Sequence, residues 1–203
     1  MHDSESANPG IRWSGMTHPG RFRKNNEDAF LGLILYEQEA HYLGKEGEHP
    51  LDGYQFVFAV SDGMGGANAG DFASRTALQF TLKRLPELIH EAPAAAAGAR
   101  AGLVQRLFLE IDREILRVSR FYEESRGMGA TLSLCWVHPG GITYGHIGDS
   151  RIYFLPASDS MRQVSEDHSE VGRLRREGKL NERQSKIHPE RHLLDQALGG
   201  FKR

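Results

Sequence analysis

The sequence is almost without cysteine, since Cys135 is its single thiol in 203 residues. One cysteine cannot form an internal disulfide, and it excludes a zinc site built from several cysteines. Cys135 lies within the apolar run 132–137. We therefore expect a thiol in the protein core with no catalytic role.

The sequence also has no excess of one charge sign and no long apolar run. Lys and Arg number 25 against 27 Asp and Glu, a net charge of −2, so the basic patch typical of nucleic-acid binding is not expected. No apolar run approaches the roughly 20 residues of a bilayer-spanning helix. Residues 1–10 are polar and acidic, unlike a signal peptide. These features predict a cytoplasmic protein with neither nucleic-acid nor membrane partners.

What the sequence does have is a glycine-rich segment with one carboxylate, Ser-Asp-Gly-Met-Gly-Gly at residues 61–66. It follows the apolar run 56–60, so we expect a strand that ends just before Asp62 and a turn after it. Glycine lets backbone carbonyls come close to a ligand, and hard cations prefer oxygen ligands. Asp62 and the carbonyl of Gly63 are therefore candidate metal ligands.

Two nucleotide-binding motifs do not match this segment. Residues 65–70 have the glycine spacing of a Walker loop, but Asp71 and Phe72 stand where Lys and Ser or Thr are required. A dinucleotide fingerprint that starts at Gly63 has Asn68 in place of its third glycine. Neither motif supports nucleotide binding.

The hydrophobic pattern predicts strands, then two helices, then strands and a further helix. Strands are expected at 11–16, 29–36, 54–60, 130–137, 142–147 and 150–155, with a long hairpin loop at 37–53. Helices are expected at 69–85, ending before Pro86, at 103–118, and from 164 onward. This order predicts an α+β fold in which an antiparallel sheet or sandwich is flanked by helices.

Acidic residues recur at the predicted strand ends. Glu27 and Asp28 precede the second strand, Asp62 follows the third, and Asp149 lies in a tight break between two later strands. If the strand ends meet, these carboxylates repel one another unless cations bind them, so a multi-metal site is predicted. Arg23 lies five residues before Asp28, and its guanidinium suits a phosphate group.

Six motifs in order carry a family resemblance: Arg23 with Asn26-Glu27-Asp28, the segments 60–66, 129–131, 148–151 and 165–169, and the segment 193–200. From about residue 15 to residue 200 the chain resembles the metal-dependent serine/threonine protein phosphatases (PPM, type 2C) in their bacterial form. The resemblance implies an antiparallel β-sandwich flanked by helices on both faces. It also implies a centre of two Mn²⁺ or Mg²⁺ ions at one end, with Asp62 bridging them and the Gly63 carbonyl binding one.

The resemblance implies roles for the other residues as well. Glu27 and Asp28 match acids that act mainly through metal-bound waters, and Asp149 matches an aspartate that helps hold a third metal. Arg23 matches the arginine that holds the substrate phosphate, so Arg23 and Asp62 are the predicted catalytic residues. The implied reaction is hydrolysis of phosphoserine or phosphothreonine in proteins by a metal-activated water, opposing a Ser/Thr kinase.

The sequence departs from the family pattern at its end. Family members continue beyond the position of Arg203 into two further motifs that supply aspartates to the metals. We therefore expect a polar lead at 1–10 and a phosphatase domain at 11–203 that is incomplete at its C-terminus. A catalytically inactive binding or regulatory module is the alternative. The sequence contains no H-E-x-x-H motif, which disfavours an unrelated metallohydrolase. It also has Ile152 where the nucleophile elbow of a serine hydrolase requires glycine.

Overall fold

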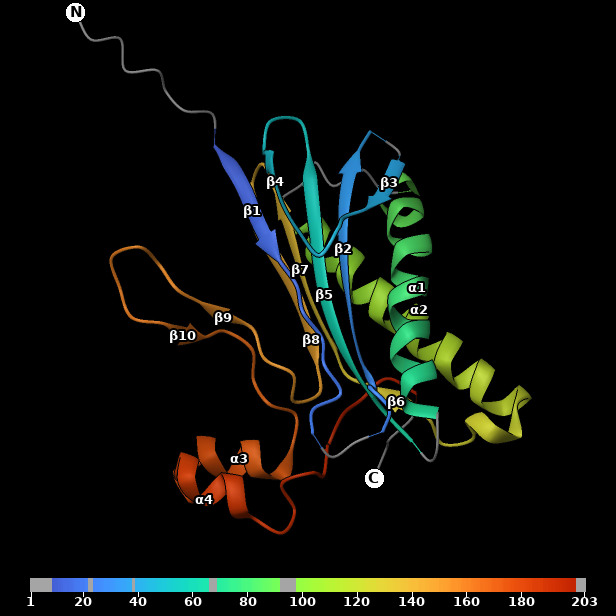
Figure 1. Ribbon diagram of the computed structural model, residues 1–203, viewed down its shortest axis with the longest axis vertical. Helices are drawn as coiled ribbons and strands as arrows, with labels where there is room; N and C mark the ends of the chain where they lie inside the picture. The colour runs from blue at the N-terminus through green and yellow to red at the C-terminus, as the bar shows by residue number, and fades with distance from the viewer. Residues whose placement is uncertain (1–8, 22–23, 38, 66–68, 92–97, 200–203) are drawn as a thin grey trace, which may run out of the picture.

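The computed structural model describes residues 9–21, 24–37, 39–65, 69–91 and 98–199 (Figure 1). Its strands are β1 (Gly10–Ser14), β2 (Asp28–Tyr36), β3 (Glu39–Tyr42), β4 (Glu46–Pro50), β5 (Gln55–Met64), β6 (Gly129–Ala130), β7 (Leu132–His138), β8 (Gly141–Ile147), β9 (Tyr153–Phe154) and β10 (Arg162–Gln163). Its helices are α1 (Ala69–Glu91), α2 (Ala99–Phe121), the 3₁₀ turn η1 (Glu123–Ser125), α3 (Glu170–Arg176) and α4 (Glu182–Ile187).

The main sheet is antiparallel and has the strand order β3-β2-β5-β7-β8, with β6 also pairing with β5. Smaller two-stranded sheets join β1 to β4 and β9 to β10. β5 lies at the centre of the main sheet, where Asp62 is opposite Asp28 of β2 and Gly63 is opposite Ala130 of β6. The candidate site residues of β2 and β5 therefore meet at one end of the sheet.

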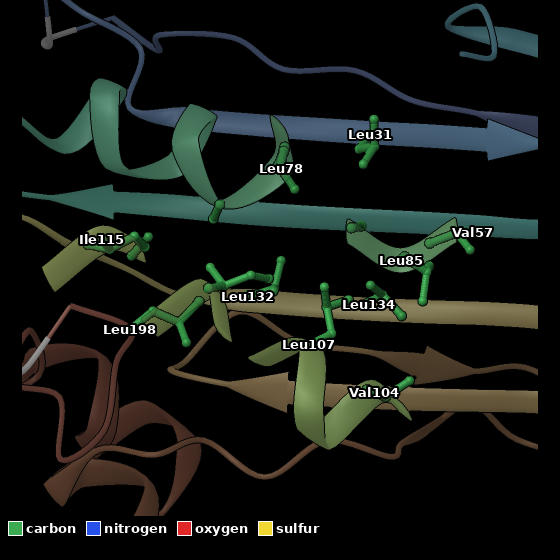
Figure 2. Close-up of a cluster of buried hydrophobic side chains, with 14 of the residues drawn as sticks. Leu31, Val57, Leu78, Leu85, Val104, Leu107, Ile115, Leu132, Leu134 and Leu198 are labelled. Carbon is green, nitrogen blue, oxygen red and sulfur yellow. The ribbon is translucent and has the colours of Figure 1, made fainter. Parts of the chain in front are cut away.

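The core lies between the main sheet and the two long helices. Alternate residues of β5 point to opposite faces of the sheet, so Val57 and Ala59 join the core that includes Ala77 of α1. Phe56 and Phe58 face the other way and contact Trp13 of β1, with ring centroids 6.1 and 6.3 Å apart. Figure 2 shows leucine and valine side chains from the helices and the strands meeting in this core.

The predicted fold class is confirmed, since antiparallel sheets are flanked by helices. In Figure 1, α1 and α2 lie on one side of the main sheet, while α3 and α4 lie on the opposite side of the molecule. No helix in the described ranges is long and apolar enough to cross a membrane. Cys135 is partly buried in β7, and this burial raises the pKa of its thiol, as suits a cysteine without a catalytic role.

The prediction of a loop at 37–53 was wrong, because β3 and β4 lie within it. β3 is an edge strand of the main sheet, and β4 pairs only with β1 in the part of the chain that the structure describes. Such strands face solvent and can be polar on both faces, so they lack the apolar alternation by which a strand is recognised. Glu48 and His49, for example, are consecutive polar residues of β4 and so point to opposite faces.

The predicted end of the first helix was also wrong. Proline removes one helical hydrogen bond and crowds the preceding turn, so a stop before Pro86 was expected. Instead α1 continues through Pro86 to Glu91. Leu85 and Leu88 on either side of it are fully buried, and this packing outweighs the local cost of proline.

The last predicted strand, 150–155, is shorter than expected and has a different partner. Only Tyr153 and Phe154 form a strand, and they pair with Gln163 and Arg162 of β10. Just before them, the Ile152 carbonyl accepts from the Val164 amide at 2.9 Å, but the Ile152 amide donates to the side-chain oxygen of Ser165 at 2.9 Å. The following helix, α3, starts only at Glu170 and not near 164, after an N-cap in which Ser169 Oγ accepts from the Gly172 amide.

Candidate metal centre

β5 does not end before Asp62 as predicted, but continues through Asp62 and Gly63 to Met64. The glycine at 63 is needed for close packing rather than for a turn. A Cβ atom at Gly63 would lie 1.8 Å from the carbonyl oxygen of Gly70, in the first turn of α1. Glycine therefore lets the start of α1 press against the end of β5.

Asp28 and Asp62 are direct cross-strand neighbours at the end of β2 and β5. Side chains in this relation lie on the same face with Cβ atoms about 4.5–5.5 Å apart, and two like charges there repel each other. Asp62 is partly buried, whereas Asp28 is exposed. A cation bound between the two carboxylates would relieve their repulsion, which is the electrostatic arrangement of a divalent metal site.

Glu27 adds a third carboxylate next to the Gly63 carbonyl. The Gly63 amide donates to the Glu27 carbonyl at 3.0 Å. A Cβ atom at Gly70 would lie 2.7 Å from Glu27 Oε1 and 2.9 Å from the Gly63 carbonyl oxygen. Both oxygens therefore converge on Gly70, and only a glycine leaves room for them. Carboxylate and carbonyl oxygens are the ligands that Mg²⁺ and Mn²⁺ prefer.

Asp149 lies in the loop that follows β8, and Thr131 joins this loop to Asp62. Thr131 Oγ1 accepts a hydrogen bond from the Asp62 amide at 2.9 Å and lies 2.8 Å from Ser150 Oγ. Gly148, with φ 105°, brings the loop against Thr131, because a Cβ atom there would lie 2.4 Å from Thr131 Cγ2. The structure thus places the predicted third-metal acid beside the end of β5.

The surroundings of Asp149 disfavour its negative charge in the absence of a cation. Burial raises the pKa of the Asp149 carboxyl, and the nearby charge of Asp167 raises it further. The charges of Arg151 and His146 act in the opposite direction but do not outweigh the effect of burial on this pKa. A divalent ion at this position would favour the ionised carboxylate.

An ion pair between the exposed Arg151 and the buried Asp167 holds the Asp149 loop to the segment before α3. Arg151 donates from Nε to Asp167 Oδ1 at 2.8 Å and from Nη2 to Oδ2 at 2.5 Å, and the Asp167 side chain is 9% exposed. Arg176 Nη1 also donates to the Asp167 carbonyl at 2.9 Å. Burial by itself would raise the pKa of Asp167, but the bonds and charge of Arg151 outweigh it and lower the pKa.

The outcome for the predicted site residues is therefore mixed. Glu27, Asp28, Asp62 and Gly63 come together, and Asp149 is linked to Asp62 through its neighbour Ser150 and Thr131. The predicted phosphate ligand Arg23 lies outside the described residues. The described residues contain no group of three or more His, Cys, Asp or Glu side chains placed to hold one ion. The fit to a metal therefore rests on the kind of oxygen donors present and on the space that Gly70 leaves.

Sequence reasoning gave no role to Thr131, Arg151 or Asp167, although all three lie within the motifs that carry the resemblance. The available signal was their place within those motifs. What the sequence does not reveal is which hydroxyl and which ion pair connect one motif to the next.

Comparisons of the sequence and of the structure with known proteins all find protein phosphatases. A family profile described as "Protein phosphatase 2C" matches residues 48–193. The serine/threonine phosphatase stp of Listeria innocua is 31% identical over 184 residues, which are 90% of this chain and 65% of that protein. The chain thus spans about two thirds of the length of this relative.

Solved structures show the same fold. The S. agalactiae serine/threonine phosphatase superposes with a TM-score of 0.72 at 23% identity, over 96% of this chain and 71% of that one. The catalytic domain of the phosphatase PstP, described in complex with 2 manganese ions, superposes with a TM-score of 0.62 at 25% identity, over 96% and 67%.

Proposed function

Because this chain belongs to the protein phosphatase 2C family, we propose that it hydrolyses phosphoserine and phosphothreonine in proteins with the help of bound divalent cations. The observation that carries the proposal is the pairing of Asp28 with Asp62, next to the point where the Gly63 carbonyl and Glu27 converge on Gly70. A cluster of oxygen donors at one sheet end is what a hard cation requires.

The proposed cofactors are two Mn²⁺ or Mg²⁺ ions, with a third at Asp149. Asp62 and the Gly63 carbonyl would hold the two main ions directly, and Glu27 and Asp28 would hold them through bound waters. When bound, such ions lower the pKa of a water molecule and screen the phosphoryl oxygens. The manganese described for the PstP catalytic domain supports this choice of metal.

The residues of the chain would bind and orient the substrate. Arg23 would hold the phosphate through the planar fork of its guanidinium, which matches two phosphoryl oxygens. Asp62 would fix the position from which water attacks phosphorus in line with the departing serine or threonine oxygen. Met64 has no proton to give, so this position of the chain does not protonate the leaving oxygen.

The proposed partners are phosphorylated proteins, with a Ser/Thr kinase that adds the phosphate. The phosphatase domain at 11–203 and the cytoplasmic location stay predictions from the sequence. A catalytically inactive module that binds phosphoprotein is the alternative, and the relatives named above give it no support, because each is described as a phosphatase.

The test is phosphate release from a phosphothreonine peptide by the 203-residue chain with and without Mn²⁺. We expect release that depends on Mn²⁺ and stops with a chelator. Asp62→Ala should lower the rate by about 10²- to 10³-fold or more, because it removes a group that positions charge in the transition state. Asp52→Ala is the matched control, since Asp52 is an exposed acid in the turn between β4 and β5.

Two results would contradict the proposal. If Asp62→Ala releases phosphate as fast as the unchanged chain, Asp62 is not the central ligand. If the chain binds the phosphopeptide but releases no phosphate with any of the metals, the inactive binding module is the correct description.

A further inference from the structure

Thr131 is fully buried between Asp62 and the Asp149 loop, and each of its polar atoms has a hydrogen-bond partner. Its amide donates to the Asp62 carbonyl at 2.8 Å, and its carbonyl accepts from Ser61 Oγ at 2.7 Å. Its hydroxyl accepts from the Asp62 amide at 2.9 Å and bonds to Ser150 Oγ at 2.8 Å. One side chain thus contacts both segments that carry the predicted metal acids.

This arrangement departs from a regular antiparallel pair. Residues in a hydrogen-bonded pair normally exchange two backbone bonds. Here Thr131 gives its amide to the Asp62 carbonyl, but the Asp62 amide turns to the Thr131 hydroxyl. The break between β6 and β7 falls at this residue. The hydroxyl therefore replaces a backbone carbonyl and becomes available to a second neighbour, Ser150.

The fit of the Asp149 loop around Thr131 is close. Gly148 has no room for a side chain, because a Cβ atom would lie 2.4 Å from Thr131 Cγ2 and 2.6 Å from its Cβ. The Thr131 methyl group therefore fixes how near the loop comes, while the hydroxyl fixes its lateral position through Ser150. A serine at position 131 would keep the hydroxyl contact with Ser150 but lose the methyl group, whereas a valine would keep the methyl contact with Gly148 and lose the hydroxyl.

We infer that Thr131 is a positioning residue whose hydroxyl sets the spacing between Asp62 and Asp149, and so couples the predicted third-metal position to the main metal centre. The inference rests on the proposed metal-dependent function. Thr131 itself need not touch a metal or the substrate. Partners that orient ligands in this way commonly contribute about 10- to 100-fold to metal affinity.

The experiment compares Thr131→Val, which has the same shape without the hydroxyl, with Thr131→Ser, which keeps it. Thr81→Val is the matched control. Thr81 is equally buried, but its hydroxyl bonds only to the Ala77 carbonyl within α1, at 2.8 Å. The readouts are Mn²⁺ affinity by calorimetry and amide hydrogen exchange by NMR without metal.

We expect Thr131→Val to weaken Mn²⁺ binding by about 10-fold or more, while Thr131→Ser and Thr81→Val stay within about 3-fold of the unchanged chain. In the metal-free protein, hydrogen exchange at the Gly148 and Ile152 amides should be faster in Thr131→Val than in the unchanged chain. It should not change in Thr131→Ser or Thr81→Val. The inference is overturned if these amides are unaffected by Thr131→Val, or if Thr81→Val changes them and the Mn²⁺ affinity equally.

The two proposals can fail separately. A chain that binds Mn²⁺ through a Thr131-dependent site but releases no phosphate would refute the proposed function and uphold this inference. A chain that binds no Mn²⁺ would refute the metal proposal, and the exchange rates of Gly148 and Ile152 would then decide whether Thr131 couples the two segments.

Discussion

The helix-covered core and the segment 148–199 are held together by different kinds of contact. In the core, apolar side chains from the main sheet and from the two long helices are fully buried together, among them Leu33, Leu85, Ile111 and Leu134. In the segment 148–199 the buried polar side chains include Ser165, Asp167, Ser169 and Ser185, and the buried apolar ones are Val171, Ala197 and Leu198, of which Leu198 belongs to the core. The first region is packed by apolar surface, and the second is positioned by hydrogen bonds.

This difference separates stability from geometry. Fully burying one large apolar side chain contributes about 1.5–3 kcal/mol, whereas a typical hydrogen bond contributes about 0.5–1.5 kcal/mol net. Hydrogen bonds are directional, however, and apolar contacts are not. The core should therefore fix whether the chain folds, while the polar contacts of 148–199 should fix where Asp149 lies and should open locally before the core does.

The largest expected effect is in the core. Leu134→Ala should lower the free energy of unfolding by about 2–5 kcal/mol, because Leu134 is fully buried in β7 and its loss leaves a cavity. Urea denaturation measures the change. Leu155→Ala is the control, since Leu155 is 67% exposed and should change stability by no more than about 0.5 kcal/mol. Equal losses in the two variants would remove the distinction between the regions.

A smaller and more local effect is expected at the ion pair of Arg151 and Asp167. Asp167→Asn should lower the local stability of the segment by about 1.5–3 kcal/mol, the range for hydrogen bonds to charged groups. Hydrogen exchange should quicken at Ile152 and in α3 but not in β5 or α1. A matching loss of stability in the core strands would show that the segment unfolds only together with the core.

The smallest effect concerns an ionic contact between the two long helices that cover the core. Glu110 of α2 bonds to Arg84 of α1, and these side chains are 18% and 17% exposed. The bonds from Arg84 lower the pKa of Glu110. A carboxyl with a lowered pKa in the folded state stabilises the fold above its unfolded pKa of about 4.3, and this contribution is lost as the pH falls through the folded value.

Glu110→Gln should therefore lower stability by about 1 kcal/mol at pH 7, and the difference from the unchanged chain should begin to shrink as the pH falls below about 4.3 and vanish below the lowered folded pKa. Chemical denaturation at a series of pH values measures this. A difference that grows toward acid pH would mean that the pKa of Glu110 is raised in the folded chain, contrary to its contact with Arg84.

The sequence predicted the parts of the fold that depend on apolar periodicity. The predicted strands at 29–36, 54–60, 130–137 and 142–147 correspond to β2, β5, β7 and β8, because their apolar faces pack in the core. β3 and β4 were missed, since they are polar strands outside the core. Residues 150–152 were assigned to a strand together with the apolar residues that follow them, because the sequence does not show that the Ile152 amide bonds to the Ser165 side chain.

The meeting of acids at strand ends was predicted from the sequence, whereas the contacts that position them were not, and their role as metal ligands stays a prediction. Placing acids at strand ends identified Asp28 and Asp62 as neighbours, because antiparallel register brings those ends together. The role of Gly63 was attributed to a turn, whereas the glycine makes room for the Gly70 carbonyl of α1. Contacts between distant segments, such as Thr131 with Ser150, follow from packing and leave no pattern along the chain.

The most direct test of the central claim is the paramagnetic broadening of amide NMR signals by Mn²⁺, with Mg²⁺ as the diamagnetic reference. If divalent ions bind between the acids, the signals of Asp62, Gly63, Gly70 and Asp149 should broaden first. Gln55 begins the same strand about eight residues away, roughly 26 Å at the rise of a β-strand, and its signal should remain sharp. Broadening centred elsewhere, with Asp62 and Gly63 unaffected, would contradict the account.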